Sequence, residues 1–247
     1  MSKFGEVPLQ RVIRFRSGTT VTDAASTPVA LVRTGNCCPF VEFGGRGATA
    51  AQRWQNGHMT LHITGDDAAD ALLSGNPFAL LVGMLLDQQI AMETAFAGPA
   101  KIRDRIGSLD PALIASYDAE AFVEVFRQSP AVHRFPGSMA KRVQDVAEVI
   151  VQNWNSDTAS IWTADNPTGP ETLSRLKALP GFGEQKAKIF LALLGKRLGV
   201  DAAGWREASA PYGEEGAFRS VADIVDPESV TRVRETKRAA KAAAQKA

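Results

Sequence analysis

The nine residues from Leu179 to Ala187, LPGFGEQKA, constrain the fold of this chain more than any other stretch. They follow a short helical segment, 171–178, and lead into a longer one, 184–198, whose apolar residues recur at helical spacing. Two glycines flank one hydrophobic residue, so the backbone can turn tightly and approach another molecule closely. The helix that follows starts with N–H groups that lack intrahelical partners and carry partial positive charge. The turn therefore suits a phosphate group.

The pattern Leu-Pro-Gly-hydrophobic-Gly-x-x-x-Ala resembles the helix-hairpin-helix element, which holds a nucleic-acid backbone without reading its bases. A Gly-x-Gly alone would be weak evidence, because most such pairs are ordinary turns. Here helical segments lie on both sides and Ala187 occupies the packing position, which favours a nucleic-acid-binding hairpin. Phe182 is expected to anchor it to the core. The predicted DNA contacts are Leu179, Pro180, Gly181, Phe182, Gly183, Gln185 and Lys186.

Positive charge is concentrated in two places. Residues 1–58 carry seven Lys/Arg against three Asp/Glu, which leaves 21 against 24 in residues 59–247. A protein that coats DNA through general charge is therefore not expected. Within 59–247, residues 171–206 hold seven basic and three acidic residues, and residues 229–247 hold six and one. The first of these stretches contains the hairpin, where a phosphate contact is wanted.

Several classes of protein are excluded by composition. No run approaches eighteen apolar residues, so no membrane partner is expected. The adjacent pair Cys37 and Cys38 cannot form a disulfide framework or a four-cysteine cluster site. His58, His62 and His133 are too dispersed to indicate a metal site. A cytoplasmic protein without a signal peptide is the expectation.

Residues 1–58 differ from the rest, because they mix Gly, Thr, Ser and Arg with short apolar fragments and show no sustained period. We expect a poorly ordered extension, translated from a start codon placed too early. The alternative is a genuine appendage, such as an arginine-rich targeting peptide. A helical domain is then expected over 59–228 and a basic C-terminal helix or tail over 229–247.

From Met59 on, the pattern predicts an all-α fold. Asn76-Pro77 signals the start of a buried central helix that runs on to Phe96. A short alternating segment precedes it at 59–64, and a basic, alanine-rich helix opens at Asp226-Pro227. The other expected segments are helices at 99–106, 111–117, 119–128 (capped by Asp118) and 138–154, the pair of hairpin helices over 171–198, a loop at 155–169, a connector at 199–217 and a helical turn near 219–225.

Three stretches in this order resemble the HhH-GPD superfamily of base-excision DNA glycosylases, of the endonuclease III and 3-methyladenine DNA glycosylase II type. They are PFALLVGMLLDQQI at 77–90, GSMAKRVQDVAEVIVQNW at 137–154 and the hairpin itself. The resemblance implies that a nucleotide is flipped out of duplex DNA and that its glycosidic bond is broken. An aspartate after the hairpin would stabilise the positive charge that develops on the sugar.

The family's aspartate corresponds to Asp201 in LGVDAAGW. Its spacing from the hairpin is somewhat shorter than in the family, and no proline accompanies the glycine. Asp201 could instead be an exposed loop carboxylate or a helix cap. Asp223 and Asp87 are the other candidates for the catalytic acid.

Bifunctional members carry a nucleophilic lysine at the position of Gln185. An amide cannot attack the sugar, so the resemblance implies base removal without strand cleavage. Lys186 is one residue further, about 100° around the helix, and is expected to face elsewhere as a phosphate contact. The family's iron–sulfur cluster has no counterpart here, and no other cofactor is implied. Hairpin carbonyls in the family can hold a monovalent cation.

Gln88 and Gln89 resemble a glutamine pair of the alkyladenine branch, in which Gln89 would fill the gap left by the flipped base. The alternative is a polar end on a buried helix, although two adjacent amides there need partners or exposure. Trp205 and Tyr212 are candidates for stacking on the base, or else aromatic residues of the core.

The hypothesis from the sequence is a monomeric, nucleoid-associated, monofunctional DNA glycosylase that binds double-stranded DNA without sequence preference. The alternative is a non-catalytic DNA-binding protein of the same fold, and a more distant one is an interaction module of a repair complex. Which lesion is removed depends on the shape of the pocket, which these motifs do not specify.

Overall fold

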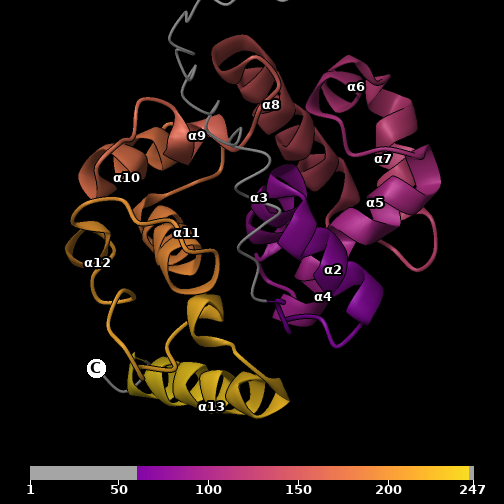
Figure 1. Cartoon of the computed structure of the whole chain (residues 1–247). Coiled ribbons are helices and arrows are strands. Elements are labelled where there is room, and N and C mark those ends of the chain that lie inside the picture. Colours follow the sequence, from indigo (N-terminus) through magenta and orange to yellow (C-terminus); the bar gives the residue numbers. More distant parts are fainter. Residues whose placement is uncertain (1–59, 245–247) are drawn as a thin grey trace, which may run out of the picture. The chain divides into compact units, whose positions relative to one another are not determined.

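The computed structural model describes residues 60–244, and these residues form helices and no strand (Figure 1). The all-α fold class is therefore confirmed. The expectations for residues 1–58 lie outside the described residues. The helices are α2 (Asp67–Gly75), α3 (Pro77–Leu86), α4 (Met92–Phe96), α5 (Gly98–Ile106), α6 (Pro111–Ser116), α7 (Ala119–Arg127), α8 (Pro136–Trp154), α9 (Ser160–Thr163), α10 (Gly169–Lys177), α11 (Glu184–Arg197), α12 (Trp205–Ala208) and α13 (Pro227–Ala244), with a 3-10 turn η1 (Val221–Asp223) before the last.

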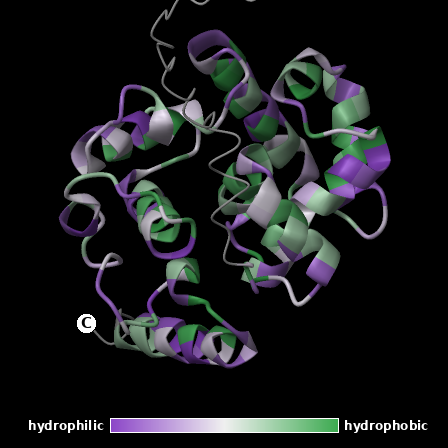
Figure 2. Cartoon of the chain, in the orientation of Figure 1, coloured by the Kyte–Doolittle hydropathy of each residue, from purple (hydrophilic) through white to green (hydrophobic). Residues whose placement is uncertain are grey.

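Helix α3 is the buried centre of the fold. Asn76 caps it by accepting a hydrogen bond from the Ala79 N–H at 3.0 Å, and proline occupies the first turn, as the sequence predicts. Every residue from Phe78 to Leu86 is buried. Figure 2 shows the contrast between α3, which is mostly hydrophobic, and α13, in which hydrophilic residues predominate.

The expected continuation of this helix to Phe96 is wrong. Helix α3 ends at Leu86, and α4 begins only at Met92. The polar residues between them form a turn in which Gln89 adopts a left-handed φ of 58°. The Gln88 side chain donates to the Leu85 carbonyl at 2.7 Å, which satisfies a helix-end carbonyl that a continuing helix would have used. Three consecutive polar side chains thus end the apolar helix.

The alternating segment before α2 is buried in alternation but forms no strand over residues 60–64. Leu61 and Ile63 are buried. Their N–H groups donate to side chains of α2, Ser74 and Asp70 respectively, rather than to a neighbouring strand. A period of two therefore indicates which residues face the core without indicating a sheet.

Helices α5 to α8 follow the sequence expectation closely. Helix α8 packs against α6 and α7, and Gln144 of α8 donates to the carbonyls of Ile114 and Tyr117. The only addition in this region is the short α9, which lies within the segment expected to be a loop.

The hairpin helices α10 and α11 pack against each other and against α12. A capping box between Thr168 and Glu171 starts α10. Trp205, 8% exposed, lies where a side chain at Gly195 of α11 would have to go, since a Cβ there would be 2.5 Å from the indole ring. Trp205 is therefore a packing residue of this helical layer.

The C-terminal helix α13 is part of the same compact unit as the other described helices. Val230 and Val233 are buried in the core. Arg234 forms an ion pair with Glu93 of α4 at 2.6 Å, which joins residues 141 positions apart. The boundary predicted at residue 229 thus lies within α13, and this helix contacts the rest of the unit through buried valines and through an ion pair.

No single helix within residues 60–244 is long and apolar enough to cross a membrane. Only α2 and α3 taken together reach that length and composition. They are bent by 115° at the break, and nine of the ten residues of α3 are buried by the other helices.

The packing of Trp205 predicts the effect of a single methyl group. Gly195→Ala should destabilise the protein by about 1–3 kcal/mol, because the Cβ would overlap the indole ring and outweigh the gain in helix propensity. Gly137→Ala, in α8 with no atom within 4 Å of the added Cβ, is the matched control and should be neutral or stabilising. Urea unfolding of both variants measures this. Equal stability of Gly195→Ala and Gly137→Ala would show that the Trp205 ring does not pack closely against Gly195 of α11.

Candidate functional site

The hairpin is a turn whose apolar residues point inward and whose glycines face outward. Leu179 and Phe182 are buried, and Phe182 packs edge-on against Phe190 of α11 with ring centroids 6.0 Å apart. Gly181 and Gly183 are exposed. Gly181 has a left-handed φ of 78°, and a Cβ there would meet the Leu85 side chain at 2.8 Å. The turn thus needs glycine at 181 both for its backbone and for its fit against α3.

Helix α11 begins with exposed N–H groups. Its N-cap residue is Gly183, with no side-chain cap, and the first intrahelical bond runs from the Ala187 N–H to the Gly183 carbonyl at 3.0 Å. The N–H groups of Glu184, Gln185 and Lys186 therefore have no backbone partner within the described residues. Such a helix start can bind a phosphate through backbone N–H groups.

The turn after α3 lies against the hairpin and is held by two residues that sequence reasoning missed. Arg142 of α8 donates to the Gln88 Oε1 atom at 2.7 Å, and a His133 ring nitrogen lies 3.0 Å from the Gln88 carbonyl oxygen. Burial lowers the pKa of His133, although the Gln88 and Leu86 carbonyls oppose this. Since Arg142 and His133 are 54 and 45 positions from Gln88, no local pattern could have found them.

The two glutamines differ in their surroundings. Gln88 is half-buried, and its amide is occupied by Arg142 and the Leu85 carbonyl. Gln89 is exposed at the tip of the turn, and no hydrogen bond engages its side chain among residues 60–244. Gln88 therefore shapes the turn, while the Gln89 side chain is available to a ligand.

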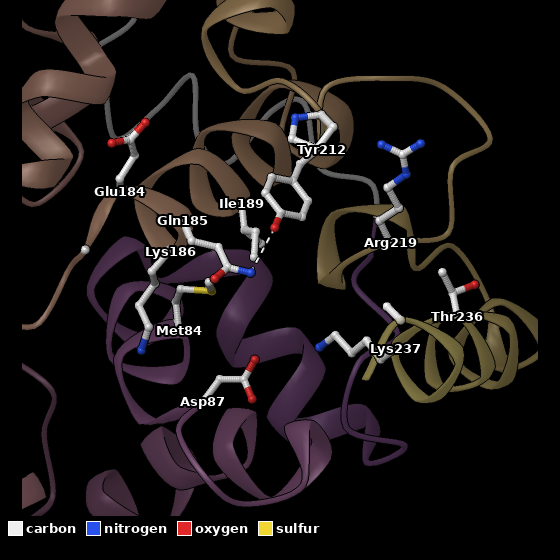
Figure 3. A pocket seen from close by; sticks show the side chains of 13 residues that line it. Met84, Asp87, Glu184, Gln185, Lys186, Ile189, Tyr212, Arg219, Thr236 and Lys237 are labelled. Carbon is white, nitrogen blue, oxygen red and sulfur yellow. Dashed lines mark hydrogen bonds between the residues drawn. The ribbon is translucent and has the colours of Figure 1, made fainter. Parts of the chain in front are cut away.

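A cavity of about 860 Å³ lies beside the hairpin (Figure 3). The end of α3, the start of α11, the connector before η1 and helix α13 all contribute to it. Its lining residues are Met84, Asp87, Gly183, Glu184, Gln185, Lys186, Ile189, Pro211, Tyr212, Arg219, Thr236, Lys237 and Ala240. The cavity is large enough for a nucleoside and combines apolar with charged walls.

Gln185 and Tyr212 meet in this cavity. The Gln185 Nε2 donates to the Tyr212 hydroxyl at 2.9 Å (Figure 3). Tyr212 lies close to the hairpin because the chain after α12 runs back toward the start of α11. Of the two aromatic candidates, Tyr212 lines the cavity, while Trp205 is packed against α11 on the other side of the connector.

Lys186 lines the same cavity, but its side chain diverges from that of Gln185 (Figure 3). Its long side chain reaches back to α3, where Nζ donates to the Leu85 carbonyl at 2.9 Å. Burial lowers the pKa of this ammonium to about 8, with Asp87 opposing the change and Arg142 adding to it.

Asp87 is the one carboxylate among the three candidates that lines the cavity. Burial raises its pKa, and the nearby Lys237 and Lys186 ammonium groups oppose the rise, while Glu93 adds to it. No hydrogen bond to its carboxylate is formed within residues 60–244. The group is therefore half-buried, close to two cations and open to the cavity.

Asp201 lies exposed after the far end of α11 and does not line the cavity. Helix α11 is 14 residues long, or about 21 Å at 1.5 Å per residue. Asp201 follows its last residue, Arg197, by only four positions, which is too short for the chain to return to the hairpin. The structure does not bring Asp201 and Gln185 together.

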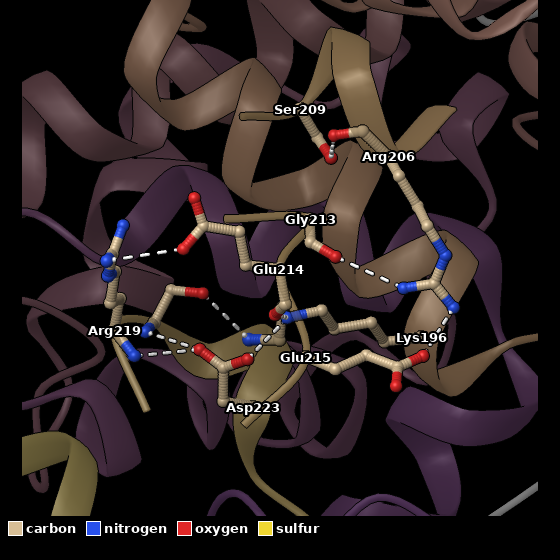
Figure 4. Close-up of polar contacts among 10 residues, drawn as sticks. Lys196, Arg206, Ser209, Gly213, Glu214, Glu215, Arg219 and Asp223 are labelled. Atoms are coloured by element: carbon tan, nitrogen blue, oxygen red, sulfur yellow. Dashed lines mark hydrogen bonds and ion pairs between the residues drawn. The ribbon is translucent and has the colours of Figure 1, made fainter. Parts of the chain in front are cut away.

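Asp223 is occupied in holding the connector (Figure 4). Its carboxylate accepts hydrogen bonds from the N–H groups of Arg219 and Ser220 at 2.8 and 3.0 Å, and it pairs with Lys196 of α11 at 2.6 Å. It is 9% exposed and lines no described cavity. These contacts fix the return of the chain that carries Tyr212 and Arg219 to the cavity.

No group of three or more His, Cys, Asp or Glu side chains that could hold a metal ion is found in residues 60–244. Cys37, Cys38 and His58 lie outside the described residues. His62 is exposed and His133 is engaged with the turn after α3.

A family model described as "HhH-GPD superfamily base excision DNA repair protein" matches residues 82–246, which is more than half of the chain. The match begins within α3, includes the hairpin and runs through α13, and so covers every wall of the cavity. No curated protein and no solved structure matches the chain.

The two hairpin glycines predict different outcomes for the same substitution. Gly183→Val should fold with unchanged stability, since its φ is −72° and no atom lies within 4 Å of an added Cβ. It should nevertheless weaken binding of any duplex, by roughly tenfold or more, because the side chain blocks backbone approach. Gel-shift titration with unrelated duplexes measures this.

Gly181→Val should lose both stability and affinity, because its backbone is left-handed and its Cβ would overlap Leu85. Gly75→Val, open at the end of α2, is the control for both measurements. Wild-type affinity of Gly183→Val would show that DNA does not approach this turn.

Proposed function

The chain belongs to the HhH-GPD superfamily of base excision DNA repair proteins, and on that premise we propose that it is a monofunctional DNA glycosylase. It hydrolyses the N-glycosidic bond of a damaged base whose nucleotide is flipped out of duplex DNA. The observation that carries the proposal is the cavity beside the hairpin. It holds Asp87 close to Lys186 and Lys237, and the Asp87 carboxylate accepts no hydrogen bond from residues 60–244.

DNA binding starts at the hairpin. The exposed N–H groups at the start of α11 hold a phosphate, and because backbone N–H groups read no base, this contact is independent of sequence. Gln89, exposed at the tip of the neighbouring turn, enters the gap that the flipped nucleotide leaves. Both contacts lie at the rim of the cavity, since Gly183 lines it and Gln89 follows Asp87 by two positions.

The flipped base enters the cavity between α11 and α13. Tyr212 offers an aromatic face, which can stack on many kinds of base. Met84 and Ile189 supply apolar surface, and the Gln185 amide keeps hydrogen-bonding capacity beyond its bond to Tyr212. Stacking and apolar contacts stabilise the base, and the polar groups orient it.

Asp87 supplies the carboxylate for the reaction. Cleavage of the glycosidic bond develops positive charge on the sugar, and a fixed negative group beside it stabilises the transition state more than the ground state. The partial burial that raises the pKa of Asp87 also lowers the local dielectric, which strengthens this interaction. The Lys186 and Lys237 ammonium groups oppose this rise in the pKa of Asp87 and so favour its ionised form. Hydrolysis then needs only water as the second substrate.

A second candidate function is DNA binding without catalysis. It is favoured by one observation, that Asp201 at the family's aspartate position stays remote from the hairpin. The two functions differ in base release. A protein that binds duplexes through the hairpin but releases no base from any of a panel of single defined lesions is a binding protein only.

The placement of the aspartates predicts opposite results for two substitutions. Asp87→Asn should reduce single-turnover base release by about 100- to 1,000-fold while duplex affinity stays equal or rises, because a charge needed in the transition state is removed. Asp201→Asn, exposed and outside the cavity, is the matched control and should keep wild-type activity. The wild-type rate should fall with acid at a pH above the ordinary range of an aspartate, since burial raises the Asp87 pKa.

Loss of base release in Asp201→Asn, with Asp87→Asn unaffected, would contradict this assignment. It would require the loop after α11 to move on DNA binding.

The second prediction concerns covalent chemistry. Borohydride should trap no protein–DNA adduct, and strand breaks should appear only after alkali, because Gln185 is not nucleophilic and the Lys186 Nζ is held by the Leu85 carbonyl. Trapping followed by gel electrophoresis measures this. An adduct that forms with the wild type and disappears in Lys186→Gln would make the protein bifunctional, with Lys186 as the nucleophile.

A further inference from the structure

The wall of the cavity opposite Asp87 comes from the C-terminal helix. Thr236, Lys237 and Ala240 of α13 line the cavity. The helix is held in this place by its buried residue Val233 and by the ion pair between Arg234 and Glu93. A segment that reads as a basic tail in the sequence is thus fixed as part of the site.

Lys237 points across the cavity toward Asp87 (Figure 3). No hydrogen bond or ion pair engages the Lys237 side chain within residues 60–244, and none joins it to Asp87. An ammonium and a carboxylate therefore face each other across open space. Among residues 60–244, neither group forms an ion pair that would neutralise its charge directly.

This arrangement matches the charge that glycosidic cleavage separates. The sugar becomes positive and the departing base becomes negative, so the transition state has two charged ends. We propose that Lys237 is a catalytic residue that stabilises and protonates the departing base, and that the site therefore acts on bases that are uncharged in DNA. The inference rests on the proposed glycosylase function and deepens it.

The step balances with water as the only co-reactant. The bond between C1′ and the base nitrogen breaks, and both its electrons stay on the base. Lys237 gives its Nζ proton to the base, and the water oxygen bonds to C1′. The proton that the water loses passes to the Asp87 carboxylate and returns to the Lys237 amine through solvent. The products are the free base and an abasic sugar.

The charge of the cavity supports the same substrate class. Lys186, Arg219 and Lys237 line it, and its acidic residues are Asp87 and Glu184. Glu184 pairs with Lys188 at 3.0 Å and Arg219 pairs with Glu214 at 3.3 Å, which leaves the two lysines and Asp87 as the charges that face the cavity. An alkylated base with a fixed positive charge would be repelled by the lysines. It also leaves as a neutral molecule and gains little from an acid. Deaminated bases such as uracil or hypoxanthine are uncharged and carry carbonyl oxygens that accept from lysine.

The test compares leaving groups and variants. Single-turnover base release is measured for duplexes that contain uracil, hypoxanthine or cationic 7-methylguanine, and duplex affinity is measured separately. The wild type should release at least one of the uncharged bases. Lys237→Gln should slow that release by about 100-fold with little change in affinity, and should slow any release of 7-methylguanine much less.

Two further variants separate chemistry from folding and from general charge. Lys237→Arg keeps the positive charge and should retain more of the rate than Lys237→Gln. Lys241→Gln, an exposed residue one turn further along α13 and outside the cavity, should behave as the wild type. Melting temperatures of all three should agree, because these side chains are exposed.

The outcomes distinguish this inference from the proposed function. Release of 7-methylguanine alone, or full activity of Lys237→Gln on an uncharged base, would overturn the role of Lys237 and leave the glycosylase proposal standing. An equal loss on all bases that matches a loss of affinity would make Lys237 a phosphate contact only. If none of these duplexes loses a base, the inferred substrate class and the role of Lys237 fail. If no duplex of the wider panel of single defined lesions loses one either, the glycosylase proposal fails as well.

Discussion

The site depends on how one buried helix ends. Helix α3 is apolar over its whole length and stops abruptly, which leaves the Leu85 carbonyl without a helical partner. Two donors satisfy that oxygen, the Gln88 amide at 2.7 Å and the Lys186 ammonium at 2.9 Å. The first folds the turn back on the helix, and the second joins it to the hairpin helix. Asp87, the residue that directly follows α3, thereby comes to line the cavity.

The rest of the cavity wall comes from the connector after α11 and from α13, which pack beside the junction of α3 with α11. The connector after α11 is held by Asp223, paired with Lys196, and it returns Tyr212 to Gln185. Helix α13 then covers the open side and is fixed to α4 by the ion pair between Arg234 and Glu93. The first two contacts join the connector to α11, and the third joins α13 to α4. The cavity thus forms through contacts between residues that are distant in sequence, whereas the hairpin beside it depends on residues that are close in sequence.

The sequence predicts those features that depend on residues close together in the chain. The hairpin, the caps at Asn76 and Asp118 and most helix boundaries rest on residues a few positions apart, and all were recovered. The sequence predicts too long a helix at α3, because the apolar residues beyond Gln88 and Gln89 continue the helical pattern. Lys237 and Arg142 could not be assigned, since only the folded chain brings them to Asp87 and Gln88. Family spacing pointed to Asp201, but the loop after α11 is too short to carry it back.

In the proposed reaction, a flipped nucleotide enters the cavity between α11 and α13 and reacts beside Asp87. A structure of the protein with a duplex that carries a 2′-fluorinated, non-hydrolysable nucleotide of an accepted lesion would test this placement. We expect the sugar C1′ within about 3.5 Å of the Asp87 carboxylate and the base between Tyr212 and Lys237. A nucleotide that stays stacked in the duplex, or one extruded beside Asp201, would contradict it.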